Sequence, residues 1–179
     1  MLISKRIFKR FFPSQLEKSI FHIDYNKLWQ KGYKALVFDI DNTLAKRTDP
    51  KPNHKTTTLI NHLVKMGFKI ALLSNNSKNR VDIFNKELRL PAVYKAKKPG
   101  SKGITQALKM LQIKDKRKAV LIGDQIFTDS YCGKRFNIYT IIVKPIDEKA
   151  EEWYVRLKRF PEKWVLKSYL KIQEEVQNG

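Results

Sequence analysis

The chain has 179 residues, of which 42% are hydrophobic and 11% are aromatic. This length favours one domain with a single core, and this composition excludes a largely disordered chain. Lys and Arg number 37 against 17 Asp and Glu, which gives a formal net charge of +20. Such a charge favours nucleic acid, anionic lipid or a phosphorylated substrate as partner, although lysine used as the default solvated residue explains it equally well.

Cysteine usage and hydropathy indicate a protein of the reducing cytoplasm. Cys132 is the only cysteine, so an internal disulfide is excluded and we expect a small buried side chain there. No apolar run approaches the roughly 20 residues of a membrane span, and the start of the chain lacks the apolar core of a secretory signal. We therefore expect a cytoplasmic location, with association at the inner face of the membrane as the open alternative.

The opening stretch MLISKRIFKRFF is predicted to form a basic amphipathic helix. On a helical wheel its apolar residues share one half of the surface, and its lysines and arginines share the other. The apolar residues are Ile3, Ile7, Phe8, Phe11 and Phe12. Such a helix either lies in an anionic membrane surface or docks on the protein's own sheet, and the sequence favours neither.

Residues 35–143 repeat one pattern, in which a short apolar run and a polar turn precede a helical segment. The runs are KALVFDID, FKIALLSNN, PAVYKAKKPG, KAVLIGDQ and YTIIVKP. Because these runs are continuously apolar, they indicate strands buried on both faces, as in a parallel sheet of βαβ units. The expected fold is α/β, with a doubly wound, mostly parallel sheet. We expect one domain over 1–179, with its core in 33–145 and helical flanks in 1–32 and 146–179.

Three helices inside this pattern are predicted from their N-terminal caps. Asn53, Ser77 and Ser101 each precede a stretch with apolar residues at helical spacing. Side-chain oxygens of Asn and Ser can accept a hydrogen bond from the first free backbone N–H groups of a helix.

Polar side chains follow four of the predicted strands. Asp39 and Asp41 follow the first strand, Ser74 the second, Lys98 the third and Asp124 the fourth. The carboxyl ends of parallel strands share one edge of the sheet, where ligands bind in open α/β folds. We therefore expect these five side chains to form one site.

These residue types suit phosphoryl transfer. Three carboxylates in one crevice repel one another, and a hard divalent cation, most naturally Mg²⁺, relieves the repulsion. Lys98 and the Ser74 hydroxyl suit the oxygens of a phosphoryl group. An aspartate beside phosphorus can act as a nucleophile, and a second one two residues along the strand can serve as acid and base.

Each motif also has a plainer interpretation. DIDNTL could be an EF-hand fragment, but Leu44 stands where the calcium loop needs Gly. The Asp-x-Asp and GDQ stretches could be turn chemistry, and Lys98 could be one more surface lysine. The occurrence of four such motifs in order, one per strand end, favours the catalytic interpretation.

The motifs DIDNT, SNN, KP and GDQIFTD, in this order, resemble the four motifs of the haloacid-dehalogenase (HAD) superfamily of phosphohydrolases. Their local forms are most similar to the YqeG type, subclass IIIA, which is itself similar to the mitochondrial phosphatidylglycerophosphate phosphatases of fungi and plants. The resemblance implies a Mg²⁺-dependent phosphatase of phospholipid biosynthesis that works through an aspartyl-phosphate, with phosphatidylglycerophosphate as the leading substrate.

The resemblance also implies a role for each matched residue. Asp39 resembles the nucleophile, Asp41 resembles the general acid and base, and Lys98 resembles the third catalytic residue. The implied metal ligands are Asp39, the backbone carbonyl of Asp41, Asp124 and, at longer range or through water, Asp129. The residues implied to bind the substrate are Thr43, Ser74, Asn75 and Lys98.

The gaps between the motifs are too short for the lid domain of many HAD enzymes. Residues 44–70 and 76–97 each hold little more than one helix and its loops. Resemblance to capless members implies an open site that suits a large substrate or a phosphate group on a surface.

Two helices are predicted in the C-terminal flank, one on each side of Pro161. Apolar residues at helical spacing in the first are Ala150, Trp153, Tyr154, Leu157 and Phe160. Those in the second are Trp164, Leu166, Tyr169 and Leu170. Aromatics interleaved with Lys and Arg could stack on nucleobases or lie at a lipid interface, but packing into the core is the favoured interpretation.

Two further functions compete with the lipid phosphatase. The charge and the basic, aromatic C-terminal third favour a nucleic-acid or ribonucleoprotein-binding protein with a secondary HAD site. The other alternative keeps the phosphatase and changes the substrate to a nucleotide or a phosphoprotein. The sequence makes no prediction of the oligomeric state.

Overall fold

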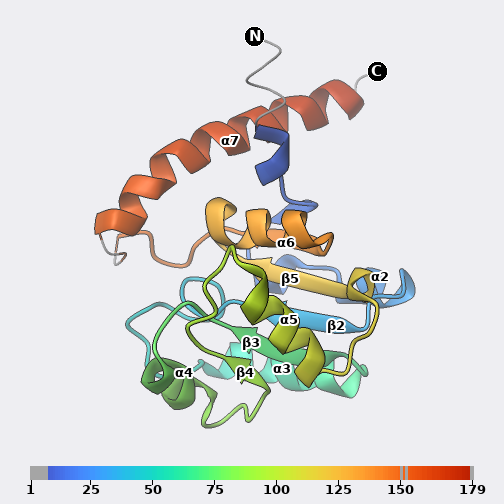
Figure 1. The fold of residues 1–179 in the computed structure, drawn as a ribbon, viewed down its shortest axis with the longest axis vertical. Coiled ribbons are helices and arrows are strands. Elements are labelled where there is room, and N and C mark those ends of the chain that lie inside the picture. The colour runs from blue at the N-terminus through green and yellow to red at the C-terminus, as the bar shows by residue number, and fades with distance from the viewer. Residues whose placement is uncertain (1–7, 150, 152, 178–179) are drawn as a thin grey trace.

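The protein is an α/β sandwich built on one parallel sheet (Figure 1). The computed structural model describes residues 8–149, 151 and 153–177. Six strands lie in the order β1-β6-β5-β2-β3-β4, and each of these neighbouring pairs is parallel. The strands are β1 (Gln15–Glu17), β2 (Ala35–Phe38), β3 (Lys69–Leu73), β4 (Ala92–Val93), β5 (Ala119–Gly123) and β6 (Tyr139–Val143). The predicted parallel α/β fold is confirmed.

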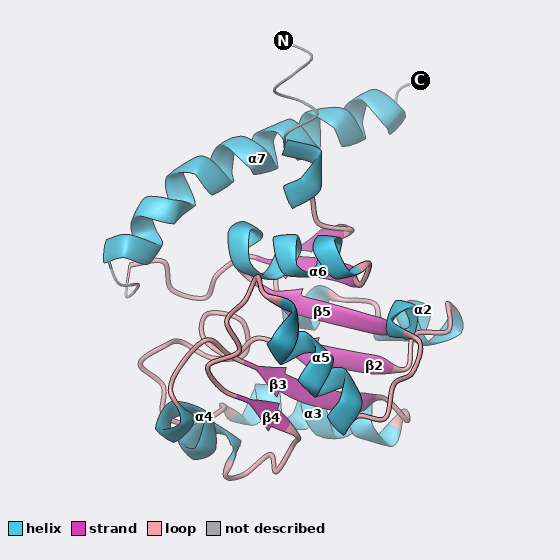
Figure 2. Cartoon of the chain, in the orientation of Figure 1, coloured by secondary structure: helices cyan, strands magenta, loops and turns pink. Residues whose placement is uncertain are grey.

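Helices connect the strands and cover both faces of the sheet (Figure 2). They are α2 (Tyr25–Gln30), α3 (His54–Lys65), α4 (Lys78–Asn85), α5 (Ser101–Met110), α6 (Tyr131–Phe136) and α7 (Trp153–Gln177). Shorter helical turns are η1 (Lys9–Phe11), η2 (Ile20–His22), η3 (Lys116–Lys118) and the π-helical turn η4 (Ile126–Ser130). Asn53 and Ser77 cap α3 and α4 as predicted, whereas α5 begins at Ser101 itself, after Gly100.

Alternate residues of the central strands fill two separate cores, because successive side chains of a strand point to opposite faces. Leu36 and Phe38 of β2 pack in the core beneath α2, α3 and α4. Ala35 and Val37 pack in the core beneath α5 and α6. The central strands are thus buried on both sides, and their carboxyl ends reach solvent only at one edge of the sheet.

The N-terminal flank adds a strand that the sequence analysis did not predict. Residues 15–17 pair with residues 141–143 of β6 and extend the sheet. Tyr25 and Leu28 of α2 are buried in the core. The flank 1–32, expected to be helical only, therefore belongs partly to the sheet and its core.

The described end of the opening stretch docks on the protein. Phe8, Phe11 and Phe12 pack against a small core that includes Ile126 and Val165. Ile3 and Ile7 of the predicted helix lie outside the described residues. For these three phenylalanines, docking on the body of the protein is the observed arrangement.

The C-terminal flank is one helix and not the two that were predicted. α7 continues through Pro161, because Val155 and Val165 are buried on both sides of the proline and hold the helix against the body. The expectation that the stripe packs in the core is confirmed for Tyr169, which is buried, and is wrong for the members that are exposed: Trp153, Leu157, Phe160, Trp164 and Leu170. Among the described helices, none combines the length and apolar character that a membrane span requires.

Candidate active site

Three carboxylates converge at the carboxyl edge of the sheet. Asp39 follows β2, Asp124 follows β5, and Asp129 lies in the turn η4. All three are buried, and one oxygen from each lies within 4.8 Å of the others. Two of the three, Asp39 and Asp124, were predicted to meet from their strand ends alone, and Asp129 was implied by the resemblance.

Lys98 supplies a buried positive charge to this cluster. Its Nζ donates to Asp39 Oδ1 at 2.5 Å and to Asp129 Oδ1 at 2.7 Å. Burial alone would lower the pKa of Lys98, but the carboxylates of Asp129 and Asp39 raise it above its ordinary value. The ammonium therefore stays protonated while it bridges two of the three acids.

Burial makes negative charge costly at this edge of the sheet. It raises the pKa of Asp39 to about 7, although Lys98 opposes the shift. It also raises the pKa of Asp124 well above its ordinary value, against the effect of Arg159. A cation held among these oxygens would favour the ionised carboxylates.

The acidic cluster has the donor set of a site for a hard cation. Asp39, Asp124 and Asp129 each offer a carboxylate oxygen, and oxygen ligands suit Mg²⁺ better than soft metals. The residues present therefore fit a magnesium ion, which Asp39, Asp124 and Asp129 would hold.

A pocket of about 210 Å³ opens beside the cluster. Its walls come from the ends of four strands and from α7. The lining residues are Asp39, Asp41, Arg47, Ser74, Asn75, Asn76, Lys98, Gln125, Thr128, Val155 and Lys158. Five of the predicted residues thus line one pocket, whereas Thr43, Asp124 and Asp129 are buried outside its lining.

The carboxylate of Asp41 is held on the wall of this pocket by two neighbours. Asp41 Oδ1 accepts hydrogen bonds from Arg80 Nε at 3.1 Å and Nη2 at 2.9 Å, and Oδ2 accepts from Asn76 Nδ2 at 3.1 Å. Sequence reasoning missed both partners. Asn76 was visible as the last residue of SNN, and Arg80 lies within the first turn that Ser77 caps.

The Asn75 side chain forms hydrogen bonds with the backbone of Lys98. Its Oδ1 accepts from the Lys98 backbone N–H at 2.7 Å, and its Nδ2 donates to the Lys98 carbonyl at 3.2 Å. The Asn75 side chain therefore fixes the loop that carries the lysine. A direct contact of Asn75 with phosphate stays a prediction.

The loop after Asp41 is tied to the end of β5 and to the C-terminal flank. The Thr43 hydroxyl donates to Asp124 Oδ1 at 3.4 Å. Asn42 has a left-handed backbone (φ 64) and donates from Nδ2 to Glu151 Oε1 at 2.8 Å. Asn tolerates this backbone region better than most residues do.

Arg159 of α7 is the principal site residue that sequence reasoning missed. It forms buried ion pairs with Asp124, Glu151 and Glu162, and its Nη1 donates to the Asp124 carbonyl at 2.8 Å. Glu162 Oε1 in turn accepts from the Phe127 backbone N–H at 3.0 Å. No local pattern marks such a residue, because Asp124 lies 35 positions away in the sequence.

Gly123 leaves the space that Asp129 occupies. A Cβ at this position would lie 2.3 Å from Asp129 Cγ, a distance that real contacts essentially never reach. The glycine of the GDQ stretch therefore allows Asp129 to approach the end of β5. The Gln125 backbone N–H donates to Asp129 Oδ2 at 3.1 Å and helps to fix this position.

Comparisons with known proteins agree on one family. The model of the mitochondrial PGP phosphatase family matches residues 5–146. A Bacillus subtilis (strain 168) protein, "Probable phosphatase YqeG", is 34% identical over 94% of this chain and 96% of its own length. The Arabidopsis thaliana protein "Phosphatidylglycerophosphate phosphatase 1, chloroplastic/mitochondrial" is 26% identical over 89% of this chain, which spans about half (48%) of that protein.

A solved structure shows a similar fold. An uncharacterized protein from Listeria monocytogenes serotype 4b superposes with a TM-score of 0.51 at 18% identity. The match covers 66% of this chain and 85% of that one.

Proposed function

This chain belongs to the mitochondrial PGP phosphatase family of HAD-type phosphatases, and from that premise we propose that it hydrolyses the terminal phosphomonoester of phosphatidylglycerophosphate with the help of magnesium. One observation carries the proposal: a buried triad of aspartates meets a buried lysine, and two members of this cluster, Asp39 and Lys98, line an open pocket. This donor set matches what a magnesium-assisted attack on phosphorus requires.

The proposed reaction has two steps. In the first, an oxygen of Asp39 attacks phosphorus, the bond from phosphorus to the glycerol oxygen breaks, and Asp41 gives a proton to that leaving oxygen. In the second, Asp41 takes a proton from a water molecule that attacks the aspartyl-phosphate, which releases inorganic phosphate and regenerates Asp39. Asp41 is held for both transfers by Arg80 and Asn76.

Asp39, Asp124 and Asp129 would hold the magnesium ion, and the backbone carbonyl of Asp41 stays a predicted fourth ligand. The ion would supply the positive charge that draws phosphoryl oxygens toward Asp39 and offsets the repulsion among the acids. Lys98, which contacts Asp39 and lines the pocket, stabilises the negative charge of the phosphoryl group, and Ser74 offers a hydroxyl to it. Thr43 and Asn75 position Asp124 and Lys98.

The lipid is favoured over smaller substrates by the family and by the charge. A net charge of +20 attracts anionic surfaces. The pocket also has two cationic residues in its wall, Arg47 and Lys158, in addition to Lys98. Phosphatidylglycerophosphate carries a second, diester phosphate that such cations can bind.

Phosphate release by the purified protein tests this function. With Mg²⁺ and phosphatidylglycerophosphate in detergent micelles, the protein should release phosphate, and chelation of the metal should stop the release. Asp39→Asn should lower kcat by at least about 10³-fold, because it removes the nucleophile, and mass spectrometry of the quenched wild type should find phosphate on Asp39. If Asp39→Asn still releases phosphate, this site is not the catalytic site.

A panel of alternatives decides the substrate separately from the chemistry. Nucleotides, sugar phosphates and phosphopeptides should be hydrolysed with a lower kcat/KM than the lipid. A higher kcat/KM on any of them, abolished by Asp39→Asn, would replace the lipid as substrate.

A further inference from the structure

α7 carries a second apolar face, which points away from the body of the protein. Val155, Val165 and Tyr169 face the body and are buried. Four large side chains lie on the opposite side at helical spacing, which we call the outer face of α7: Trp153, Leu157, Phe160 and Trp164. At about 100° per residue they span an arc of roughly 60°, centred about 150° from the buried face.

The exposure of this face sets it apart from the rest of the described surface. The four side chains are 73%, 64%, 70% and 64% exposed. Elsewhere, exposed large apolar residues such as Val64, Ile83 and Met110 stand singly on different helices at 44–48% exposure. Contiguous apolar patches of this kind mark interaction surfaces, whereas scattered residues do not.

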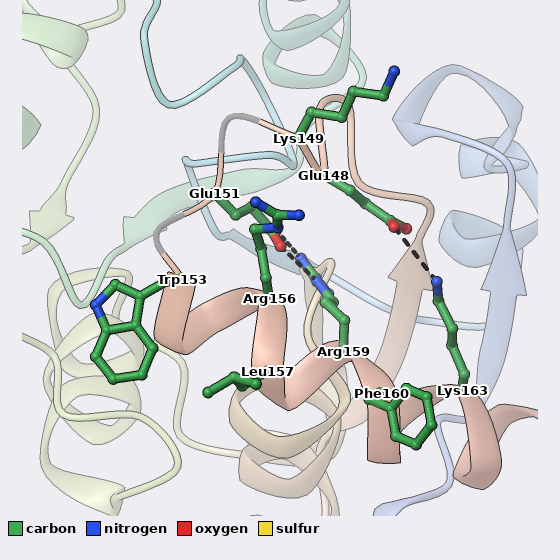
Figure 3. Close-up of a pocket in the computed structure, with 9 residues that line it drawn as sticks. All are labelled: Glu148, Lys149, Glu151, Trp153, Arg156, Leu157, Arg159, Phe160 and Lys163. Atoms are coloured by element: carbon green, nitrogen blue, oxygen red, sulfur yellow. Dashed lines mark hydrogen bonds and ion pairs between the residues drawn. The ribbon is translucent and has the colours of Figure 1, made fainter.

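Cationic side chains border the outer face. A hollow of about 600 Å³ lies along it, and Figure 3 shows Trp153, Leu157 and Phe160 in a row along the helix. Arg156, Lys149 and Lys163 line the same hollow, with Glu148 in an ion pair with Lys163 at 3.8 Å. Lys167 follows on the next turn and is exposed.

We propose that the outer face of α7 seats this protein in the interfacial region of an anionic lipid bilayer. Tryptophan and phenylalanine lie at the level of lipid headgroups, and flanking lysines and arginines attract anionic lipid. A second copy of the chain fits this face less well, because it would bring another +20 net charge against the same cationic border.

This seat would place the catalytic pocket about one helix thickness from the lipid surface. On the inner side of the same helix turns, Val155 and Lys158 line the pocket, and Arg159 contacts Asp124. Only the thickness of one helix, about 10 Å, separates the two sides. The inference deepens the proposed function and rests on it for the choice of a lipid surface.

Vesicle sedimentation tests the proposal without any turnover. The wild type should sediment with vesicles of two parts phosphatidylcholine to one part phosphatidylglycerol, and hardly at all with phosphatidylcholine alone. The variant with Trp153→Ser, Leu157→Ser, Phe160→Ser and Trp164→Ser should bind the mixed vesicles roughly tenfold more weakly or worse. In a Trp29→Phe background, the remaining tryptophans should shift their emission to shorter wavelength on binding.

A matched control removes the same number of exposed apolar side chains elsewhere. The control variant carries Phe21→Ser, Val64→Ser, Ile83→Ser and Met110→Ser, and it should bind vesicles like the wild type. Circular dichroism and hydrolysis of soluble para-nitrophenyl phosphate should be unchanged in the outer-face variant. Asp39→Asn should bind vesicles normally, so failure of the catalytic proposal is distinguished from failure of this one.

Three results would overturn the inference. The first is equal vesicle binding by the wild type and the folded outer-face variant. The second is no binding of the wild type to mixed vesicles. The third is a wild-type dimer, measured by analytical ultracentrifugation, that the outer-face substitutions convert to monomer, since the face would then be an interface between copies.

Discussion

The ammonium of Lys98 lies between two buried carboxylates that have few other neutralising partners. Its contacts with Asp39 and Asp129 are 2.5 and 2.7 Å, and the Lys98 side chain is only 2% exposed. Removing one partner from a buried ion pair leaves the others charged and unpaired, which costs more than the pair contributes. Lys98 therefore stabilises the folded site before any substrate binds.

Lys98→Met should destabilise the protein strongly when no metal is present. In chelator at neutral pH, we expect the free energy of unfolding to fall by about 3 kcal/mol, because Asp39 and Asp129 lose their shared cation. Urea denaturation followed by circular dichroism measures this change. Lys97→Met, at the exposed neighbouring lysine, is the matched control, and an equal loss in both variants would contradict the explanation.

Cys132 gives the stability a pH dependence of known sign. Its side chain is fully buried, and burial raises the pKa of the thiol to about 12. Above the thiol pKa of the unfolded chain, about 8.5, the unfolded state releases a proton that the folded state keeps. The thiol contribution to stability is therefore constant below that pH and declines as pH rises toward 12.

The comparison of wild type with Cys132→Ala isolates this contribution. Between pH 8 and about pH 10, the wild type should lose about 2 kcal/mol more of its free energy of unfolding than Cys132→Ala does. Urea titrations at several pH values provide the measurement. Parallel pH profiles for the two proteins would show that the thiol ionises equally well in the folded state.

At the scale of elements, Arg159 joins α7 to the candidate site through buried ion pairs. Arg159 pairs with Asp124 at the end of β5, with Glu151 before the helix, and with Glu162 one turn later. Glu151 also accepts from Asn42 in the loop after β2 at 2.8 Å. Arg159 thus joins the C-terminal flank to the end of β5 and, through Glu151, to the loop after Asp41.

Arg159→Ala should loosen α7 as well as destabilise the protein. Loss of the guanidinium leaves three buried carboxylates without their cation, so we expect a fall of about 3–5 kcal/mol in the free energy of unfolding. Relative to the wild type, the variant should show faster amide hydrogen exchange in α7, and this increase should be larger than the increase in β2 and β5. Hydrogen exchange followed by mass spectrometry measures both. Arg156→Ala, on the exposed side of the same helix, should change neither quantity.

The elements that sequence reasoning predicted are those with local signals. β2, β3 and β5 appear as apolar runs, and the caps Asn53 and Ser77 mark two helices. The strand β1 was missed because Gln15–Glu17 has no such run and depends on pairing with β6. The break at Pro161 was predicted from local chemistry, and burial of the helix on both sides of the proline outweighs it.

The residues of the candidate site also fall into two groups, those that the sequence predicts and those that only the fold reveals. Motif residues Asp39, Ser74, Lys98 and Asp124 were placed together because strand ends share an edge. Arg159 and Arg80 act across 35 and 39 positions of sequence, respectively. Neither stands in a motif, so only the folded chain brings them to Asp124 and Asp41.

At the scale of the whole molecule, the net charge opposes folding and favours binding to an anionic bilayer. A net charge of +20 repels itself in the compact state and attracts an anionic bilayer. Salt screens both effects, because the Debye length falls from about 30 Å at 0.01 M to about 8 Å at 0.15 M. Stability and membrane binding should therefore change in opposite senses over this range.

Added sodium chloride should raise the melting temperature while it weakens vesicle binding. We expect the apparent affinity for phosphatidylglycerol-containing vesicles to fall by roughly tenfold or more from 0.01 M to 0.15 M salt, as the cationic border of α7 is screened. A residual affinity should persist in the wild type, because the outer face of α7 buries apolar surface that salt does not screen. The outer-face variant should have none of this residual affinity at 0.15 M salt, whereas the control variant should keep it. Calorimetry and sedimentation of the same samples give both trends, and a melting temperature that falls with salt would show that self-repulsion does not limit stability.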